Sequence, residues 1–429
     1  CKRQFSTRTS LLFIFFVKET ELKIITSDVL VCGGGISGLL AAKGLLSLGL
    51  SVVCIEKRTG GINEKSSLKD GRSTALLDPS ISFLKSLGIW ENLLKKAQPL
   101  ESLVISNLCP ETGIINQTCE FSATDLNLET LGFNVSNDFL SSELRKDLSE
   151  NINFIYLDNV DLKELVPRTD DIIALTDKPQ KIISKLVIGA DGRNSTIRRL
   201  ANIDACTFDY SQQALVFSIK HELQHQAKSF EIYEKGGPCT LVPNKTEKDK
   251  GHFSSVVLMD RPREINRALN LNKNSFSSFI SKRTGMILGE CFVKTELKKF
   301  PVISQLAKKF VGDRILLLAE SAHVMPPIGA QGLNSSVRDV SILMKLIDSG
   351  AVNKESFGNS NFLASYEKAR SFQIRSRMLG VHMLNKVSMY NYRPILAARK
   401  LGLRALDKNL KLRNFVMKLG MYEKTSSRL

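Results

Sequence analysis

Hydrophobic and polar positions follow two periods along this chain, and their order indicates alternating strands and helices. Residues 29–32 form a short apolar run, apolar side chains then recur at helical spacing through residue 46, and a second apolar run covers residues 51–55. This change of period predicts a strand, a helix and a second strand. Residues 184–203 and 314–349 repeat the change from apolar run to helical pattern. The alternation favours an α/β fold with a parallel sheet.

Composition places the chain among globular proteins. Its 429 residues are enough for two or three domains, and 43% of them are hydrophobic and 24% charged. Eight cysteines occur without a C-x-x-C pair, which indicates a reducing compartment. The apolar stretch at residues 11–17 is too short to span a bilayer, and we place residues 1–25 outside the fold as an extension.

The net charge of +17 favours an acidic partner, but composition does not choose among nucleic acid, anionic lipid and acidic ligands. Residues 393–421 are dense in Lys and Arg, and their apolar residues recur at helical spacing. Such basic amphipathic helices either lie on an anionic membrane surface or pack on their own domain with a solvated basic face. Basic residues are not interleaved with aromatic ones and no nucleic-acid motif occurs, so we expect no nucleic-acid partner.

The loop after the first apolar run carries the most specific motif. Gly33, Gly35 and Gly38 satisfy G-x-G-x-x-G, in which the first glycine permits a tight turn, the second admits a pyrophosphate and the third lets helix pack on strand. An acid then follows at the spacing typical of a ribose ligand. The unit predicts a dinucleotide site, without distinguishing NAD from FAD, that comprises Gly33, Gly35, Ile36, Ser37, Gly38, Glu56 and Lys57.

Two later segments have the same build. "GADG" at residues 189–192 ends an apolar run, and "AESAHVMPPIGAQGLN" at residues 319–334 joins another run to a helical pattern through two prolines and two glycines. We expect the last helix to start after residues 334–336. A helix N-terminus presents free N–H groups and partial positive charge, and it therefore binds anions. An ordinary strand–loop–helix connection remains the alternative for this segment alone.

"HELQH" at residues 221–225 matches the zinc-protease pattern H-E-x-x-H, which requires a helix to bring both histidines to one face. The apolar, β-branched run at residues 214–220 predicts a strand instead. We therefore expect no metal site here.

The three glycine-containing motifs, in this order and at these separations, resemble those of the class A flavoprotein aromatic hydroxylases. Residues 70–90, 133–148 and 221–243 and the basic tail resemble the branch that acts in ubiquinone biosynthesis, and the resemblance covers residues 27–421. It implies a discontinuous Rossmann-like FAD-binding domain (26–102, 137–150, 181–203 and 302–349), a β-sheet substrate domain (103–136, 151–180 and 204–301) and C-terminal basic helices (350–429).

The resemblance also implies roles for single residues. Arg72, Asn137, Asp191, Gly192 and Glu320 match cofactor-binding positions, with Ala319 and Glu320 where that family has Gly and Asp. The last loop would supply pocket residues and present backbone N–H groups to the flavin; these residues are His323, Pro326, Pro327, Gly329, Gly332, Leu333 and Asn334.

The implied activity is an FAD-dependent monooxygenase that hydroxylates the ring of a polyprenylated phenol through a flavin C4a-hydroperoxide. Molecular oxygen would be the co-substrate and NAD(P)H the transient electron donor. We expect a cytoplasmic protein, peripheral on the inner face of the membrane or part of a quinone-biosynthesis complex. The alternatives are another FAD-dependent oxidoreductase of the same fold that inserts no oxygen, and a flavin-fold binding protein without bound flavin.

Overall fold

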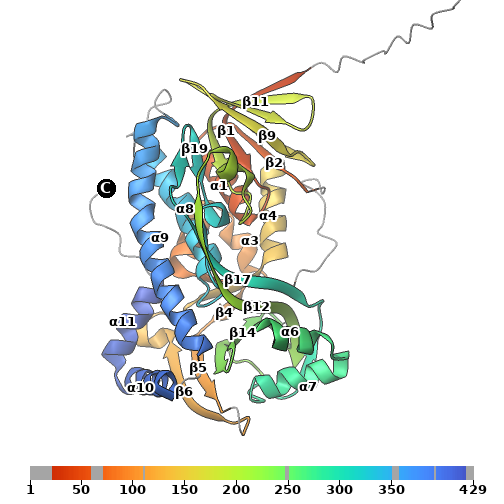
Figure 1. The fold of residues 1–429 in the computed structure, drawn as a ribbon, viewed down its shortest axis with the longest axis vertical. Helices are drawn as coiled ribbons and strands as arrows, with labels where there is room; N and C mark the ends of the chain where they lie inside the picture. Colours follow the sequence, from red (N-terminus) through yellow and green to blue (C-terminus); the bar gives the residue numbers. More distant parts are fainter. Residues whose placement is uncertain are drawn as a thin grey trace, which may run out of the picture.

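Two large sheets follow one another along the long axis of the molecule (Figure 1). The computed structural model describes residues 22–58, 71–109, 112–246, 251–349, 357–390 and 393–421. Most of the expected N-terminal extension therefore lies outside the described residues.

The first sheet contains the parallel strands that the apolar runs predict. Its strands lie in the order β18-β19-β11-β1-β2-β8, and β10 joins β11 to β9. Their bounds are Lys23–Cys32 (β1), Val52–Glu56 (β2), Phe154–Asp158 (β8), Leu162–Pro167 (β9), Ile172–Thr176 (β10), Gln180–Gly189 (β11), Val311–Gly312 (β18) and Ile315–Leu317 (β19). β1 pairs in parallel with both β2 and β11, as expected for strands connected through helices.

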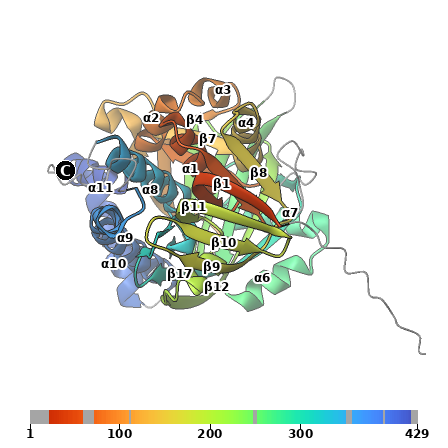
Figure 2. The ribbon, with the colours of Figure 1, turned by 90° about the horizontal axis from the view of Figure 1, so that it is seen from above.

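Helices α1 (Ile36–Ser47), α4 (Asn137–Ser149) and α8 (Gln331–Asp348) pack together beside this sheet (Figure 2). Most apolar side chains of β1 and α1 are buried in the resulting core, except Ile24 at the start of β1, which is exposed, and Ile36, which is half-buried. A separate three-stranded sheet and two short helices adjoin this domain, and of these β3 and α2 pack on α8. They are β3 (Ser73–Leu77), β4 (Gln98–Leu100), β7 (Gly132–Ser136), α2 (Asp78–Ser86) and α3 (Trp90–Leu94).

The second sheet lies below the first in Figure 1, in the order β20-β17-β12-β15-β14-β13-β5-β6, with β16 beside β12. Its strands are β5 (Ser102–Leu108), β6 (Ile115–Ser122), β12 (Ala205–His221), β13 (Lys228–Glu234), β14 (Gly237–Asn244), β15 (His252–Asp260), β16 (Cys291–Val293), β17 (Lys298–Ala307) and β20 (His323–Val324). Helices α6 (Pro262–Leu269) and α7 (Lys273–Arg283) pack on one face of this sheet in a second apolar core.

The C-terminal helices cover the side of the molecule opposite α6 and α7 (Figure 1). α9 (Ser360–Met389) runs beside both sheets, whereas α10 (Arg393–Lys408) and α11 (Leu410–Met421) pack near β6. Three short helical turns complete the described part: α5 (Thr196–Leu200), η1 (Ala123–Leu126) and η2 (Ala319–Ser321).

The strands correct three of the expected boundaries. Residues 151–180, expected in the substrate-domain sheet, form β8, β9 and β10 of the first sheet, because β8 pairs in parallel with β2 and β10 pairs with β11. Residues 302–307, expected in the cofactor domain, belong to β17 of the second sheet. The first strand starts at residue 23, within the range assigned to the extension.

Candidate functional site: a cofactor-binding sheet edge

The three motif loops leave the first sheet side by side. β1, β11 and β19 are neighbours in parallel, and their last residues Cys32, Gly189 and Leu317 lie in register. Backbone bonds then link the loops, since Ala190 N donates to Cys32 O (2.8 Å) and Leu318 N to Gly189 O (2.9 Å). In open α/β sheets, ligands bind at this carboxyl edge.

The glycines of the first loop have two different functions. Gly33 has φ +117°, and a Cβ there would lie 2.3 Å from Ala190 O; a Cβ at Gly38 would lie 1.9 Å from Gly33 O. Both positions therefore require glycine for the protein's own packing. Gly35 differs, because no described heavy atom lies within 4 Å of the position that its Cβ would take. This space is where a bound group can approach the backbone.

Helix α1 begins directly after Gly35, and no nearby side chain of the described residues satisfies the N–H groups or the positive charge of its N-terminus. Within the described residues no side chain caps it and no acid lies in its first turn, which starts with Ile36 and Ser37. By contrast, Asn272 caps α7 and Asn359 caps α9. The N–H groups of the first turn of α1 are thus left for an anion.

Glu56 supports the first loop directly. Its Oε2 accepts a hydrogen bond from Gly34 N (2.7 Å) and its Oε1 one from Arg58 N (3.0 Å). A carboxylate oxygen has more than one acceptor position, so a ribose hydroxyl can still donate to Glu56. Lys57 is exposed and forms an ion pair with Asp161 (3.0 Å).

The second loop contributes a partly unsatisfied acid. Asp191 Oδ2 accepts from Thr196 N (2.6 Å) and Ile197 N (3.1 Å) at the start of α5, whereas its buried Oδ1 has no hydrogen-bond partner among the described residues. Burial raises the pKa of this carboxyl above its ordinary value, although the Ser195 side chain and the backbone donors oppose the rise. The next residue, Gly192, has φ +82° and open space where a Cβ would stand.

The third loop starts with a strained alanine. Ala319 is buried with φ +55°, a backbone conformation that favours glycine. The alanine that departs from the family pattern therefore stands where the backbone favours the family's glycine. Glu320 is exposed in the turn η2, and its longer side chain is therefore not held inside the fold.

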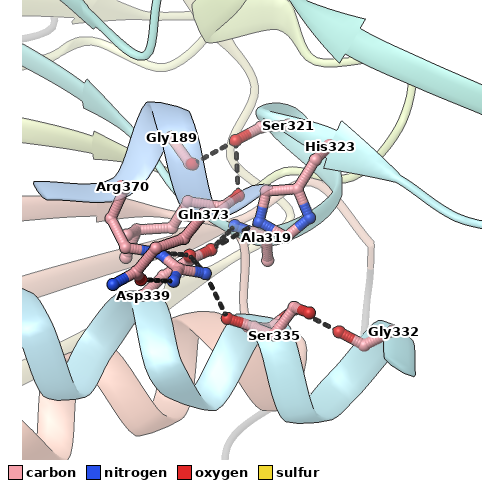
Figure 3. Close-up of polar contacts among 11 residues, drawn as sticks. Gly189, Ala319, Ser321, His323, Gly332, Ser335, Asp339, Arg370 and Gln373 are labelled. Carbon is pink, nitrogen blue, oxygen red and sulfur yellow. Dashed lines mark hydrogen bonds and ion pairs between the residues drawn. The ribbon is translucent and has the colours of Figure 1, made fainter. Parts of the chain in front are cut away.

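A buried acid on α8 holds this loop in place (Figure 3). Asp339 accepts hydrogen bonds from Ala319 N (2.9 Å), His323 Nε2 (2.8 Å) and Arg370 Nε (2.8 Å), and both side-chain partners are buried. Burial alone would raise the pKa of Asp339, but the nearby His323 and Arg370 outweigh it and hold the pKa below its ordinary value. His323, expected to line the pocket, instead faces the protein interior.

The loop ends in an unusual helix start. Pro326 is buried and Pro327 exposed, and Gly329 and Ala330 both have positive φ, of 62° and 57°. α8 begins at Gln331, earlier than expected, because residues 334–336 form its first turns and do not precede it.

The first turn of α8 is open to a ligand. No side chain of the described residues caps it and it contains no acid, and open space lies where a Cβ of Gly332 would stand. Leu333 is half-buried against the core. Asn334 was expected to present its backbone to the cofactor; its side chain joins α8 to β3, accepting from Leu77 N (3.0 Å) and donating to Ala75 O (2.8 Å).

Arg72 and Asn137, the two remaining candidates, are neighbours in the structure. Asn137 N donates to Arg72 O (3.0 Å), and the Arg72 guanidinium lies over the Phe300 ring at 5.6 Å. Asp70, which precedes them in the resembling segment, lies outside the described residues.

Sequence patterns did not identify every residue that supports the site. Arg145 of α4 donates from Nη2 to Gly34 O (3.2 Å) and lies over the Tyr156 ring. Asp339 and Arg370 are also charged residues inside helical patterns, where a solvated face is the ordinary assignment. The one signal in the sequence is that both charged residues stand at positions of the helical pattern that face inward, among apolar residues.

The H-E-x-x-H segment is a strand end, as expected. His221 is the last residue of β12, its Nδ1 lies 2.8 Å from Leu223 O and its Nε2 lies 3.0 Å from Ser254 Oγ. The two histidines of the pattern are therefore not on one helical face.

The residues at the sheet edge fit FAD on three observations. Glycines of all three motifs adjoin open space, a buried oxygen of Asp191 lacks a partner within the described part, and the helices after the first and third motifs begin uncapped. A dinucleotide with a pyrophosphate and a flavin ring needs such a cradle.

Comparison with known proteins agrees with this geometry. The chain is 27% identical to a ubiquinone hydroxylase (UbiL) of Rhodospirillum rubrum, covering 92% of this chain and 89% of the relative. It is 28% identical to the 3-demethoxyubiquinol 3-hydroxylase of Escherichia coli, covering 89% of this chain and 95% of that one. The crystal structure of p-nitrophenol 4-monooxygenase from Pseudomonas putida has the same fold, with a TM-score of 0.75, 17% identity, and coverage of 94% and 100%. The FAD binding domain family matches residues 26–377, and the chain belongs to this family.

Proposed function

We propose that this protein is an FAD-dependent monooxygenase that hydroxylates the aromatic ring of a polyprenylated phenol in ubiquinone biosynthesis. The observation that carries the proposal is the convergence of three loops at one sheet edge, with Gly35, Gly192 and Gly332 adjoining open space. The names of the similar proteins support the substrate class, since one is a ubiquinone hydroxylase and another a 3-demethoxyubiquinol 3-hydroxylase. The similarity covers nearly the full length of this chain.

The residues of the first sheet edge would bind the cofactor. Backbone N–H groups of Ile36 and Ser37 would hold the pyrophosphate, and Glu56 would accept hydrogen bonds from the ribose. Asp191 Oδ1, buried without a described partner, would accept a further hydrogen bond from the cofactor. Bound FAD supplies the redox chemistry, taking electrons from NAD(P)H and activating molecular oxygen.

The uncapped start of α8 would act on the electrostatics of the site. Backbone N–H groups at Gly332 and Leu333 form the positive end of an 18-residue helix. A helix N-terminus stabilises negative charge by about 0.3–2 kcal/mol. The protein thereby favours a negatively charged cofactor edge, while Pro326 and Ile328 exclude water beside it through burial.

The second sheet would supply the wall of the substrate pocket. Val216, Thr240, Val242 and Val257 are half-buried and alternate with residues that face α6 and α7. Two of their neighbours connect this face to the cofactor domain, because Ser218 Oγ and Ser255 Oγ both donate to Gly71 O (3.1 and 3.3 Å). An apolar wall of this kind suits a prenylated ring.

We also propose that the protein works peripherally on the inner, cytoplasmic face of a membrane. In the part of the chain that the structure describes, no helix is both long and apolar enough to span a bilayer. Residues 393–421 nevertheless contain eight Lys or Arg and one acid, and Leu401, Leu410, Phe415 and Leu419 of α10 and α11 are at least half exposed. Anionic vesicles should therefore sediment the protein, and a Phe415→Glu, Leu419→Glu variant should remain in the supernatant.

Reconstitution tests the enzymatic proposal. The purified protein, with FAD and NADPH or a chemical reductant, is incubated with polyprenylphenols in detergent, and products are identified by mass spectrometry. We expect a product 16 Da heavier than the substrate, formed in air and not under nitrogen. Oxidation of reduced FAD without a hydroxylated product, for every phenol tried, would identify a different FAD-dependent oxidoreductase.

A further inference from the structure

A buried acid lies in the same row as the pocket wall. In four neighbouring strands, Val216 pairs with Val257, Val257 with Thr240, and Thr240 with Glu231. Directly paired residues of adjacent strands project from the same face of a sheet. Glu231 of β13 therefore continues the wall that Val216, Val257 and Thr240 begin.

This row faces away from α6 and α7, and its Val257 lies beside the third cofactor loop. The residues next to it along each strand belong to the core that contains α6 and α7; they include Leu215, Phe217, Leu258, Leu241 and Ile232. Val257 instead packs in a cluster with Ile328 of the third loop and Met389 of α9. Val257 and the third motif loop thus border the same interdomain region, and the row continues from Val257 toward α9 at β13.

Glu231 is held by a single described interaction. It is 4% exposed, and its Oε1 accepts a hydrogen bond of 2.5 Å from Tyr233 Oη, which is also buried. The Arg399 guanidinium of α10 lies over the Tyr233 ring at 5.5 Å, and no ion pair to Glu231 occurs among the described residues. A buried carboxyl without a cationic partner reduces stability, so its presence in the wall that we propose for the substrate pocket calls for a functional reason.

The neighbours of Glu231 suit the junction between a polar ring and an apolar tail. On one side it pairs with Thr240, and on the other with Ile105 of β5. Ile105 packs with the apolar cluster of β6, α10 and α11. Glu231 is therefore the acidic group between the half-buried wall and the C-terminal apolar cluster.

We propose that the Glu231 carboxyl, oriented by Tyr233, binds the hydroxyl group of the substrate's aromatic ring and makes the enzyme selective for free phenols. This inference rests on the proposed function and adds the group that recognises the ring. The phenol hydroxyl donates to the carboxyl oxygen that Tyr233 does not bind, and no covalent bond changes. The contact fixes which ring carbon faces the cofactor, and it increases the electron density of the ring.

The test compares a prenylated phenol with its O-methyl ether, which has no hydroxyl proton to donate. For wild type, kcat/KM should favour the phenol, and Glu231→Leu should lose about tenfold of that preference, because it removes the buried acceptor of the phenol hydroxyl. Glu231→Gln, nearly identical in shape, should lose a smaller part. Tyr233→Phe should lose part of it by releasing the carboxyl.

Glu234→Gln is the matched control. It lies on the same strand, but its carboxyl pairs with Arg283 of α7 (2.9 Å), within the other face of the sheet. This variant should lower stability and leave the phenol preference unchanged, so a merely structural effect is separated from recognition. If Glu231→Leu does not fold, the ratio of kcat/KM for the phenol to that for the ether can still be measured with Glu231→Gln and Tyr233→Phe.

Two failures are distinguishable. A wild-type protein that hydroxylates neither compound refutes the proposed function itself. A wild-type protein that hydroxylates the phenol, with Glu231 variants that keep its full preference over the ether, refutes the role of Glu231 alone.

Discussion

Gly33 and Gly35 are two residues apart in one loop, yet an added side chain meets different surroundings at each. At Gly33 a methyl group would collide with Ala190 O at 2.3 Å, whereas at Gly35 it would enter open space. We predict that Gly35→Val keeps the melting temperature of the FAD-free protein and abolishes FAD binding, measured by quenching of flavin fluorescence.

Gly33→Ala is the contrasting variant. It should lower the stability of the FAD-free protein, because its neighbour is backbone and the φ of +117° disfavours any side chain. A Gly35→Val protein that still binds FAD with wild-type affinity would show that the open space at this loop is not the cofactor site.

Ala319 offers a test of strain at the third loop. Its φ of +55° costs an L-residue about 1–2 kcal/mol, part of which glycine recovers through backbone freedom. Ala319→Gly should therefore raise the free energy of unfolding by about 0.5–1 kcal/mol in urea denaturation. Ala322→Gly, at φ −95°, should lower it by about 0.5–1 kcal/mol; the same sign for both variants would contradict the assignment of strain to Ala319.

At the scale of elements, the short apolar runs and the glycine motifs were sufficient to predict β1, α1, β2 and β11, because each combines a clear period with a local turn signal. The start of α8 was misplaced, since Gly329 and Ala330 change the backbone direction before Gln331 and leave no side-chain cap to recognise. The interior contact of His323 was missed for a related reason. Its partner Asp339 lies 16 residues later, and only the packed helix brings them together.

The Asp339 cluster should be a strong structural element. Asp339→Asn removes the charge that pairs with the fully buried Arg370, so we expect a loss of about 3–5 kcal/mol in the free energy of unfolding. Asp147→Asn, which removes a partly exposed pair with Lys43, should cost at most about 1 kcal/mol. Equal effects in chemical denaturation would contradict the role given to this cluster.

The end of β12 should make stability depend on pH. Burial, together with the neighbouring His225 and His252, lowers the pKa of His221 to about 4. Between pH 4 and the ordinary value of about 6.5, the unfolded chain binds a proton that the folded chain does not, so stability falls as the pH is lowered through this range. The loss of stability that His221 causes at pH 5 should be about 1 kcal/mol after allowance for solvent screening.

His221→Gln removes this titration while keeping polar contacts. Its melting temperature should fall less than that of wild type between pH 7 and pH 5, and the two proteins should respond alike between pH 7 and pH 8. A variant as sensitive to acid as wild type would place the titrating group elsewhere.

At the scale of the whole molecule, the resemblance implied a cofactor domain interrupted by a second sheet, and the structure confirms the mixed α/β fold. It could not predict which sheet residues 151–180 join. Their alternating apolar pattern is the same in either sheet, and pairing with β2 and β11 is a long-range choice. Glu231 was missed likewise, because β-sheet register across four strands decides its neighbours.

The most direct test of the whole account is isotopic. The FAD-loaded protein turns over a polyprenylphenol in an atmosphere of ¹⁸O₂ and ordinary water, and the product is weighed by mass spectrometry. The account predicts one ¹⁸O atom in each hydroxylated product. A product that carries oxygen from water, or complete oxidation of the electron donor with the phenol unchanged, would contradict it.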